Sequence, residues 1–211
     1  MPILGENVNL LDIARRRKTT RSFKKGEIPP LNDILEAIEV ALEAPSGLNC
    51  QPWYFLIVSD SKIKKKIRKF CEHEERLFHE IAPDFFKEWL KKRKITWKKK
   101  FLTDAPYLIL VFSDMKCPYA IQSTWLSIGY LLLALEDKEL SSLTYTPPNT
   151  SRLRNILGID RRYSLQTIIP VGYPKKEKMK EERKKIEEKV YFNKWGKSIS
   201  SILDRYKHRL A

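Results

Sequence analysis

Cysteine and histidine are scarce in this sequence, and their scarcity limits the chemistry that we expect. The 211 residues hold three histidines and three cysteines, Cys50, Cys71 and Cys117. An odd cysteine count without a CxxC pair predicts no disulfide framework. Cys50 has no histidine near it in the sequence, so we expect core packing rather than a thiol nucleophile. With no HExxH motif and no cysteine–histidine cluster, we expect no metal site.

Long apolar runs and a signal-like start are also missing. No apolar run reaches about 18 residues, so we expect no membrane span. The first residues, MPILGENVNLLDIARRR, carry acidic side chains and lack the basic, apolar and small-residue order of a signal peptide. The sequence therefore predicts a cytoplasmic protein.

The composition is that of a folded protein with strong positive charge. Apolar residues make up 42% of the chain and aromatic residues 11%, so we expect one globular domain over residues 1–211. The net charge is +15, and Lys87–Lys100 alone carries eight basic residues and one acidic residue. Such charge suits nucleic acid, a membrane surface or a phosphate-bearing ligand.

Apolar spacing predicts the order of helices and strands. Few strands, several helices and one long apolar helix predict an α+β fold, with helices packed on a central sheet. Residues 82–100 are expected to form a mobile basic excursion, and the charged stretch after Pro174 a helix or an arm. The expected helices are Asn9–Arg17, Ile34–Leu42, Ser61–Ile81, Pro118–Lys138 and Ser151–Leu157, and the expected strands are Trp53–Ser59, Tyr107–Phe112, Leu143–Tyr145 and Gln166–Val171.

Two polar segments near the start of the chain are candidates for ligand binding. Arg15–Phe23, RRRKTTRSF, holds five cations and three hydroxyls. Arginine forks and hydroxyls match phosphate oxygens, although a basic helix end at a surface is the commoner reason for such a segment. Ala44–Trp53, APSGLNCQPW, joins a helix to a strand. Its Gly47 allows close backbone approach to a planar ligand, although an ordinary polar helix-to-strand loop is the commoner reason for such a segment.

In this order the two segments resemble the nitroreductase superfamily of FMN enzymes. Its members open with an Arg-Arg-Ser-x-Arg-x-Phe-like segment and then carry an APS-x-x-N-x-QPW-like loop. The similarity continues through DAPYLIL (Asp104–Leu110), TPPN (Thr146–Asn149), VGYP (Val171–Pro174) and RKKIEEKVYFNKW (Arg183–Trp195). The resemblance implies a three-layer fold with a mostly antiparallel central sheet, a C-terminal arm at about 175–211 that reaches a partner subunit, and a homodimer with FMN at its interface.

The resemblance also implies which residues hold the cofactor. Thr146 is the catalytic candidate, because a hydroxyl that donates to the flavin would favour one-electron steps. Lys18 keeps the charge of the arginine that the family usually has there, but it cannot bind in bidentate fashion. NAD(P)H is the implied candidate for the electron donor. The implied FMN-binding residues are Arg17, Lys18, Thr19, Arg21, Pro45, Ser46, Asn49, Gln51, Thr144, Tyr145, Thr146 and Arg183.

The middle of the chain is similar to the iodotyrosine deiodinase branch, in which a lid folds over a halogenated tyrosine. The similarity rests on APSG, KIRK (Lys66–Lys69) and a basic lid at about 82–100 that contains Trp97. It implies that Glu75 binds the substrate ammonium and Lys99 the carboxylate, whereas ordinary surface charges are the alternative for both. His79 stands where the branch has a tyrosine, and Leu48 completes the implied substrate site.

The sequence therefore predicts an FMN-dependent oxidoreductase that reduces a small aromatic substrate such as a halotyrosine, by reductive dehalogenation. A general NAD(P)H-dependent nitroreductase or quinone reductase is the alternative. A basic nucleic-acid-binding protein that uses residues 87–100 is a remote one, for which no helix-turn-helix, RRM or zinc signature is present. We expect neither nucleic acid nor membrane among the partners.

Overall fold

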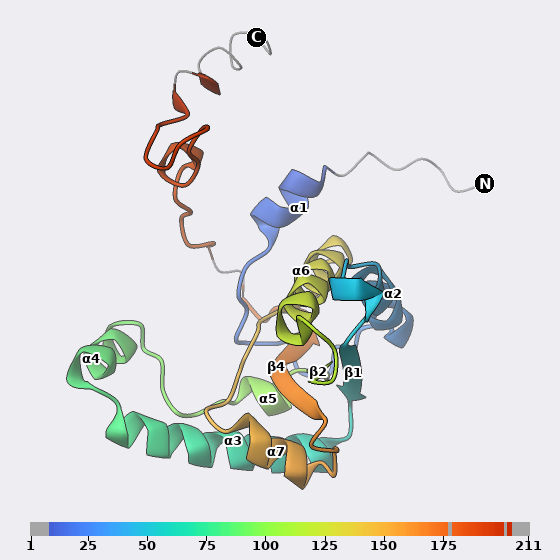
Figure 1. Cartoon of the computed structure of the whole chain (residues 1–211). Coiled ribbons are helices and arrows are strands. Elements are labelled where there is room, and N and C mark those ends of the chain that lie inside the picture. Colours follow the sequence, from blue (N-terminus) through green and yellow to red (C-terminus); the bar gives the residue numbers. More distant parts are fainter. Residues whose placement is uncertain (1–8, 177–178, 201, 204–211) are drawn as a thin grey trace. The chain divides into compact units, whose positions relative to one another are not determined.

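A computed structural model describes residues 9–176, 179–200 and 202–203 of the chain (Figure 1). The chain divides into two compact units, residues 1–179 and 180–211, and each is described by itself. None of the described helices is long and apolar enough to cross a membrane.

The first unit is built on a four-stranded sheet in the order β1-β2-β4-β3. All three strand pairs are antiparallel. β2 and β4 lie at the centre of the sheet and are buried along almost their whole length, because each has a neighbour on both sides. This confirms the predicted antiparallel central sheet. The strands are β1 (Trp53–Val58), β2 (Tyr107–Asp114), β3 (Ser141–Ser142) and β4 (Tyr163–Gly172).

The two edge strands depart from the sequence prediction. β1 was expected to be buried, but Tyr54 is 49% exposed and Leu56 is 38% exposed, because β1 pairs with β2 alone. The strand expected at Leu143–Tyr145 lies earlier, at Ser141–Ser142. Tyr145 forms only an isolated bridge to β4. Apolar periodicity in the sequence predicts a strand, but it does not tell an edge strand of a sheet from a central one.

Helices cover both faces of this sheet, which confirms the three-layer arrangement (Figure 1). Successive side chains of a strand point to opposite faces, so β2 serves two apolar cores. Ile109 and Val111 pack in one core with α2 and α6. Leu108 and Leu110 pack in the other with α3, α5 and α7. The helices are α1 (Leu10–Arg16), α2 (Leu31–Leu42), α3 (Ser61–Ile81), α4 (Asp84–Lys92), α5 (Phe101–Asp104), α6 (Ala120–Asp137) and α7 (Thr150–Ile156).

The segment between α3 and α5 holds a helix that the sequence analysis did not predict. α3 begins after Asp60, whose side chain accepts a hydrogen bond from the Ile63 amide at 2.8 Å, and it ends before Pro83. α4 follows at once, and the rings of Phe86 and Trp89 stack with their centroids 5.5 Å apart. Part of the predicted basic excursion is therefore ordered as a helix.

The second unit has little regular structure in its described part. Among residues 179–199 the structure shows one 3-10 turn, Ile186–Glu188, and no α-helix. Of the two alternatives for this charged stretch, a helix is therefore wrong over these residues. The rings of Tyr191 and Trp195 contact each other, with their centroids 4.9 Å apart, and Tyr191 bridges Ser198.

Candidate active site

The cation-rich segment after α1 runs along the edge strand β3. Thr19 forms a parallel bridge with Ser142, and the Thr20 amide donates a hydrogen bond to the Ser142 carbonyl at 3.0 Å. This pairing fixes the backbone of the segment against the sheet. Arg17, Lys18 and Arg21 therefore place three cations within five residues at one edge of the first unit.

The loop from Pro45 to Gln51 has an unusual backbone. It contains a 3-10 turn, η1 (Gly47–Asn49), and three residues that are not glycine have positive φ angles: 53° at Leu48, 52° at Asn49 and 48° at Gln51. Left-handed backbone is uncommon at such residues, and hydrogen bonds stabilise it here. The Ser46 hydroxyl accepts from the Gln51 amide at 3.0 Å. The Asn49 side-chain oxygen accepts from the Gln51 side chain at 3.1 Å. Leu48 is left 86% exposed.

Gly47 anchors this loop to the start of α6. Its amide donates to the Ser123 hydroxyl at 3.2 Å. A Cβ atom on Gly47 would lie only 2.7 Å from Cδ2 of Tyr119. The close approach that the sequence suggested for a planar ligand is therefore made to a side chain of the protein itself.

A disulfide bond closes the same region, contrary to the sequence prediction. Cys50, directly after η1, is bonded to Cys117 in the connection between β2 and α6. The two cysteines are 67 residues apart in the sequence, and their Cα atoms are 6.0 Å apart. The expectation of no disulfide, and of simple core packing for Cys50, was wrong because only the fold brings these residues together. The third cysteine, Cys71, is a buried free thiol, and burial raises its pKa to about 12.

The cation segment and the loop lie far apart within one chain. The loop enters the sheet at Trp53, which pairs with Ser113 at one end of β2. Thr19 lies at the opposite edge of the sheet, beside Ser142 of β3. Ser142 pairs with Val171 of β4, and Val171 pairs with Tyr107 at the other end of β2. Four spacings across, from β1 through β2, β4 and β3 to the Thr19 segment, and six residues along a strand give a separation of roughly 28 Å. An extended FMN molecule is shorter than this diagonal, so one flavin cannot touch both segments of a single chain.

The three residues at 144–146 are not equivalent. Thr144 and Thr146 are exposed, whereas Tyr145 is buried in the core with its ring against Phe101. Burial raises the pKa of the Tyr145 phenol far above its usual value. The Thr146 hydroxyl donates to the Gln166 carbonyl at 2.8 Å, so its proton is already engaged. Of the three side chains predicted to lie beside the flavin, Tyr145 is therefore turned away from solvent.

The three polar residues predicted to bind substrate are in contact with one another. Nζ of Lys99 lies 3.0 Å from a carboxylate oxygen of Glu75, and Nε2 of His79 lies 3.5 Å from the same oxygen. Glu75 and Lys99 are 8% and 5% exposed, so the pair is not an ordinary surface contact. An amino-acid zwitterion carries one ammonium and one carboxylate. A buried carboxylate can pair with the first, and a buried ammonium beside it can pair with the second.

Two further residues hold Lys99 in place, and the sequence analysis did not single them out. Glu72 lies one turn before Glu75 on α3, and its carboxylate accepts from the Lys99 amide at 2.8 Å. The same oxygen accepts from Nε of Arg68 at 2.8 Å. Arg68 belongs to the KIRK segment, so the sequence pointed to this residue, but it did not show the contact of Arg68 with Glu72.

Arg183, the remaining residue implied for the cofactor, belongs to the second unit. Its side chain is exposed, and Nη1 donates to the Glu181 carbonyl at 2.9 Å. The first unit thus holds every other candidate residue.

Comparison with known proteins gives a consistent result. The model of the nitroreductase family matches residues 14–173. The iodotyrosine deiodinase of Thermotoga neapolitana is 49% identical over 177 residues, which cover 84% of this chain and 95% of that protein. Iodotyrosine deiodinase 1 of Homo sapiens is 36% identical over 183 residues, which cover 79% of this chain and 61% of the human protein.

Solved structures match the fold as well. A crystal structure of oxidized iodotyrosine deiodinase bound to FMN and 3-iodo-L-tyrosine superposes with a TM-score of 0.84 at 48% identity, over 89% of this chain and 100% of that one. A BluB-like flavoprotein from Clostridium difficile 630 has a TM-score of 0.73 at 22% identity, over 89% and 100% of the two chains. At that lower identity the likeness shows the fold alone.

Proposed function

The chain belongs to the nitroreductase family and is an FMN-dependent oxidoreductase, and we propose that it removes halide reductively from a halotyrosine. The observation that carries this proposal is the buried contact of Glu75 with Lys99, beside His79. The similarity to iodotyrosine deiodinases, one of them solved with FMN and 3-iodo-L-tyrosine, supports the same substrate class.

The residues of the first unit fit FMN by their chemistry. Arg17, Lys18 and Arg21 supply cations for the phosphate and for the flavin edge that gains negative charge on reduction. Thr19 is held by its bridge to Ser142, so the cations are presented on a fixed backbone. Bound there, FMN would supply the electrons for the reaction. The polar side chains of the 45–51 loop would contact its ring.

We propose further that two chains build each flavin site, as a homodimer. The diagonal separation of the cation segment from the 45–51 loop supports this, since a second chain can bring the missing half. α6 also exposes apolar side chains that need a cover. Ile121, Trp125, Leu126 and Tyr130 are each between 40% and 49% exposed. In this arrangement the C-terminal arm would carry Arg183 to the partner.

Substrate recognition would proceed by an exchange of charged partners. Glu75 takes the substrate ammonium, and Lys99 takes the carboxylate, so each buried charge keeps an opposite charge beside it. His79 offers a hydrogen bond where it now contacts Glu75. Leu48, which is exposed, supplies an apolar surface for the ring. The net reaction replaces a carbon–halogen bond by a carbon–hydrogen bond, consumes two electrons and one proton, and releases halide.

One observation favours a second candidate function, a general nitroreductase or quinone reductase. The hydroxyl of Thr146, proposed to support one-electron steps, donates to the Gln166 carbonyl instead. Without that donor, hydride transfer from NAD(P)H through FMN to a nitroaromatic or quinone is the simpler chemistry. We also propose a cytoplasmic location, since the candidate electron donor NAD(P)H is held inside cells.

The test uses FMN-loaded protein that has been reduced without oxygen. After mixing with 3-iodotyrosine, we expect rapid flavin reoxidation with one iodide released for each flavin. Reoxidation by nitrofurazone without any iodide from iodotyrosine would reject dehalogenation and support the second function.

Binding is tested separately, by flavin fluorescence during titration with iodotyrosine. Glu75→Gln removes a charged hydrogen bond and should weaken binding by roughly tenfold to a hundredfold. Glu80→Gln, on the same helix and exposed, is the matched control and should bind as the unchanged protein does. Equal binding by both variants would show that Glu75 does not hold the ammonium.

A further inference from the structure

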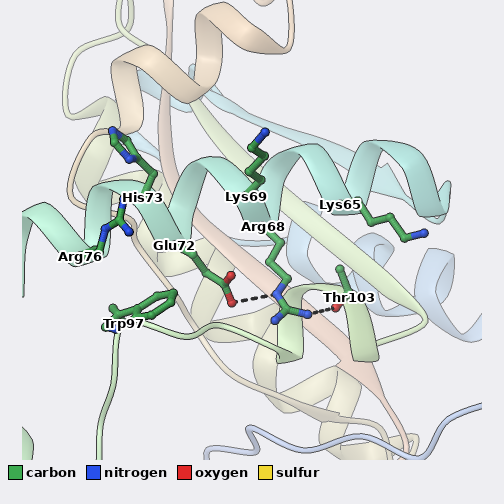
Figure 2. A pocket seen from close by; sticks show the side chains of 8 residues that line it. All are labelled: Lys65, Arg68, Lys69, Glu72, His73, Arg76, Trp97 and Thr103. Carbon is green, nitrogen blue, oxygen red and sulfur yellow. Dashed lines mark hydrogen bonds and ion pairs between the residues drawn. The ribbon is translucent and has the colours of Figure 1, made fainter.

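The outward face of α3 carries a pocket that the proposed reaction does not use. Its volume is about 470 Å³, within the range of small-molecule sites. Figure 2 shows α3 along one side of it and Trp97, from the segment after α4, on the other. Glu75 does not line it, so the pocket is separate from the substrate pair. Its lining residues are Lys65, Arg68, Lys69, Glu72, His73, Arg76, Trp97 and Thr103.

The pocket has an excess of positive charge. Four of its lining side chains are permanent cations, and the one carboxylate, Glu72, is already occupied by Arg68 and by the Lys99 amide. Within the described part of the chain, Lys65, Lys69 and Arg76 have neither an ion pair nor a side-chain hydrogen bond. Helical spacing brings them to one face of α3, where their like charges repel until an anion joins them.

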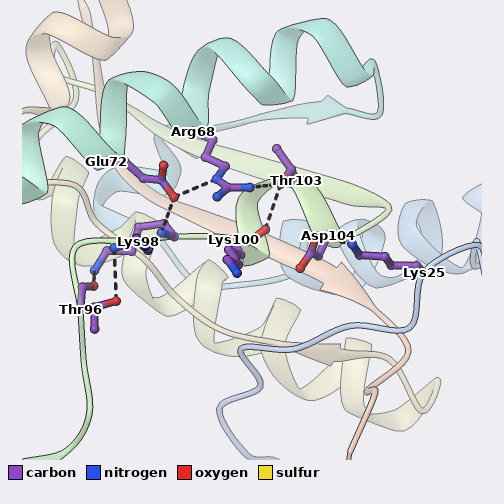
Figure 3. A network of polar contacts seen from close by, with 9 residues as sticks. Lys25, Arg68, Glu72, Thr96, Lys98, Lys100, Thr103 and Asp104 are labelled. Carbon is purple, nitrogen blue, oxygen red and sulfur yellow. Dashed lines mark hydrogen bonds and ion pairs between the residues drawn. The ribbon is translucent and has the colours of Figure 1, made fainter.

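Part of this pocket is held rigid before any ligand arrives. Arg68 donates to Glu72 and, at 2.8 Å, to the Thr103 hydroxyl, and that hydroxyl lies 3.1 Å from the Lys100 carbonyl (Figure 3). On the opposite side Trp97 is half-buried, and Nζ of Lys98 lies 5.4 Å from its ring centroid. An indole ring beside a cation-rich helix face is an arrangement suited to an aromatic molecule that carries negative charge.

We propose that this pocket binds a phosphorylated aromatic molecule with the chemistry of a nucleotide. The phosphates would lie against Lys69 and Arg76, whose ammonium and guanidinium groups match phosphate oxygens. The ring would stack on Trp97, because an indole ring can stack on any of the nucleobases. An acidic protein surface would meet the cations alone and leave Trp97 without a role, so the pairing of cations with an indole ring favours the small aromatic ligand.

The test measures binding of ADP, pyrophosphate and adenosine to the FMN-loaded full chain by equilibrium dialysis and calorimetry. We expect one ADP for each chain, with binding that weakens as salt is raised. Pyrophosphate should bind more weakly than ADP, and adenosine more weakly still. The flavin spectrum should stay unchanged, since the pocket lies apart from the candidate flavin residues. Release of FMN by ADP would place the nucleotide in the flavin site and overturn the proposal.

Matched variants locate the site. Lys69→Gln and Arg76→Gln should each weaken ADP and pyrophosphate by about tenfold, because each removes a charged contact to phosphate. Lys66→Gln changes an exposed lysine of α3 outside the pocket and should change neither the ADP affinity nor the pyrophosphate affinity. Equal losses in Lys66→Gln and Lys69→Gln would show diffuse attraction to a basic helix and overturn the assignment.

A second pair of variants tests the stacking contact. Trp97→Leu should weaken ADP by roughly tenfold and leave pyrophosphate unchanged, while Trp97→Phe should keep most of the ADP affinity. A loss of pyrophosphate binding in both variants would show that Trp97 only shapes the pocket. Unchanged ADP binding in Trp97→Leu would likewise reject the nucleotide.

Discussion

The disulfide between Cys50 and Cys117 provides the most direct test of the fold, because its effect on stability follows from chain length. A cross-link over 67 residues removes conformational entropy from the unfolded chain. At 25 °C the loop-closure relation gives about 4 kcal/mol of stabilisation for this separation. For a chain of this size that corresponds to a fall in Tm of roughly 10 °C when the bond is lost.

The assay compares thermal unfolding by circular dichroism before and after treatment with a phosphine reductant. A Cys50→Ser, Cys117→Ser double variant should already melt at the temperature of the reduced protein, and the reductant should not change its Tm. A thiol count in denatured, unreduced protein should give one free thiol, from Cys71. Three free thiols in that count, or the same Tm with and without reductant, would refute the cross-link and the reasoning.

Three further predictions concern single side chains. Gly47→Ala should destabilise the protein by about 1–3 kcal/mol in urea unfolding, because the new methyl group meets Tyr119. Cys71 should not react with a thiol reagent at pH 8 in the folded protein; since its pKa is raised from 9.0 to about 12, the stability it contributes should be lost as the pH rises through that range. Asp114→Asn should lower the urea midpoint at pH 7, because hydrogen bonding by Arg162 lowers the pKa of the Asp114 carboxylate. That difference from the unchanged protein should shrink as the pH falls below 3.8.

Each of these predictions has an outcome that contradicts it. A Gly47→Ala variant as stable as the unchanged protein would mean that Tyr119 moves freely. Rapid modification of Cys71 at pH 8 would show that its environment is open. An Asp114→Asn variant whose deficit grows at low pH would reverse the sign expected for a carboxylate with a lowered pKa.

Long elements with clear apolar periods could be predicted from the sequence, and short or edge elements could not. α3 and α6 were found within a residue or two, because their apolar spacing continues over 18 or more residues. β1 was placed correctly but taken as buried, since an apolar strand looks alike at an edge and at a centre. α4 was missed although Phe85, Phe86, Trp89 and Leu90 recur at helical spacing, because Pro83 and the surrounding run of cations indicated an irregular excursion.

The candidate site was predicted by resemblance more than by physics. Motif positions located Glu75, His79 and Lys99, and the structure brings them together. Contacts between distant segments escaped the sequence altogether. The bond from Cys50 to Cys117 and the support of Lys99 by Glu72 each depend on two elements meeting in space. No spacing rule along one element could have shown them.

The order of the strands also has a consequence for synthesis of the chain on the ribosome. β2 is complete at Asp114 and can pair with β1 at once, but its other neighbour, β4, ends only at Gly172. At translation rates of about 5–20 residues per second, one edge of a largely apolar strand waits roughly 3–12 s for its partner. During that interval the nascent chain is open to pairing with its copies on neighbouring ribosomes. Expression yield should therefore depend on chaperone supply and on translation speed between residues 115 and 172.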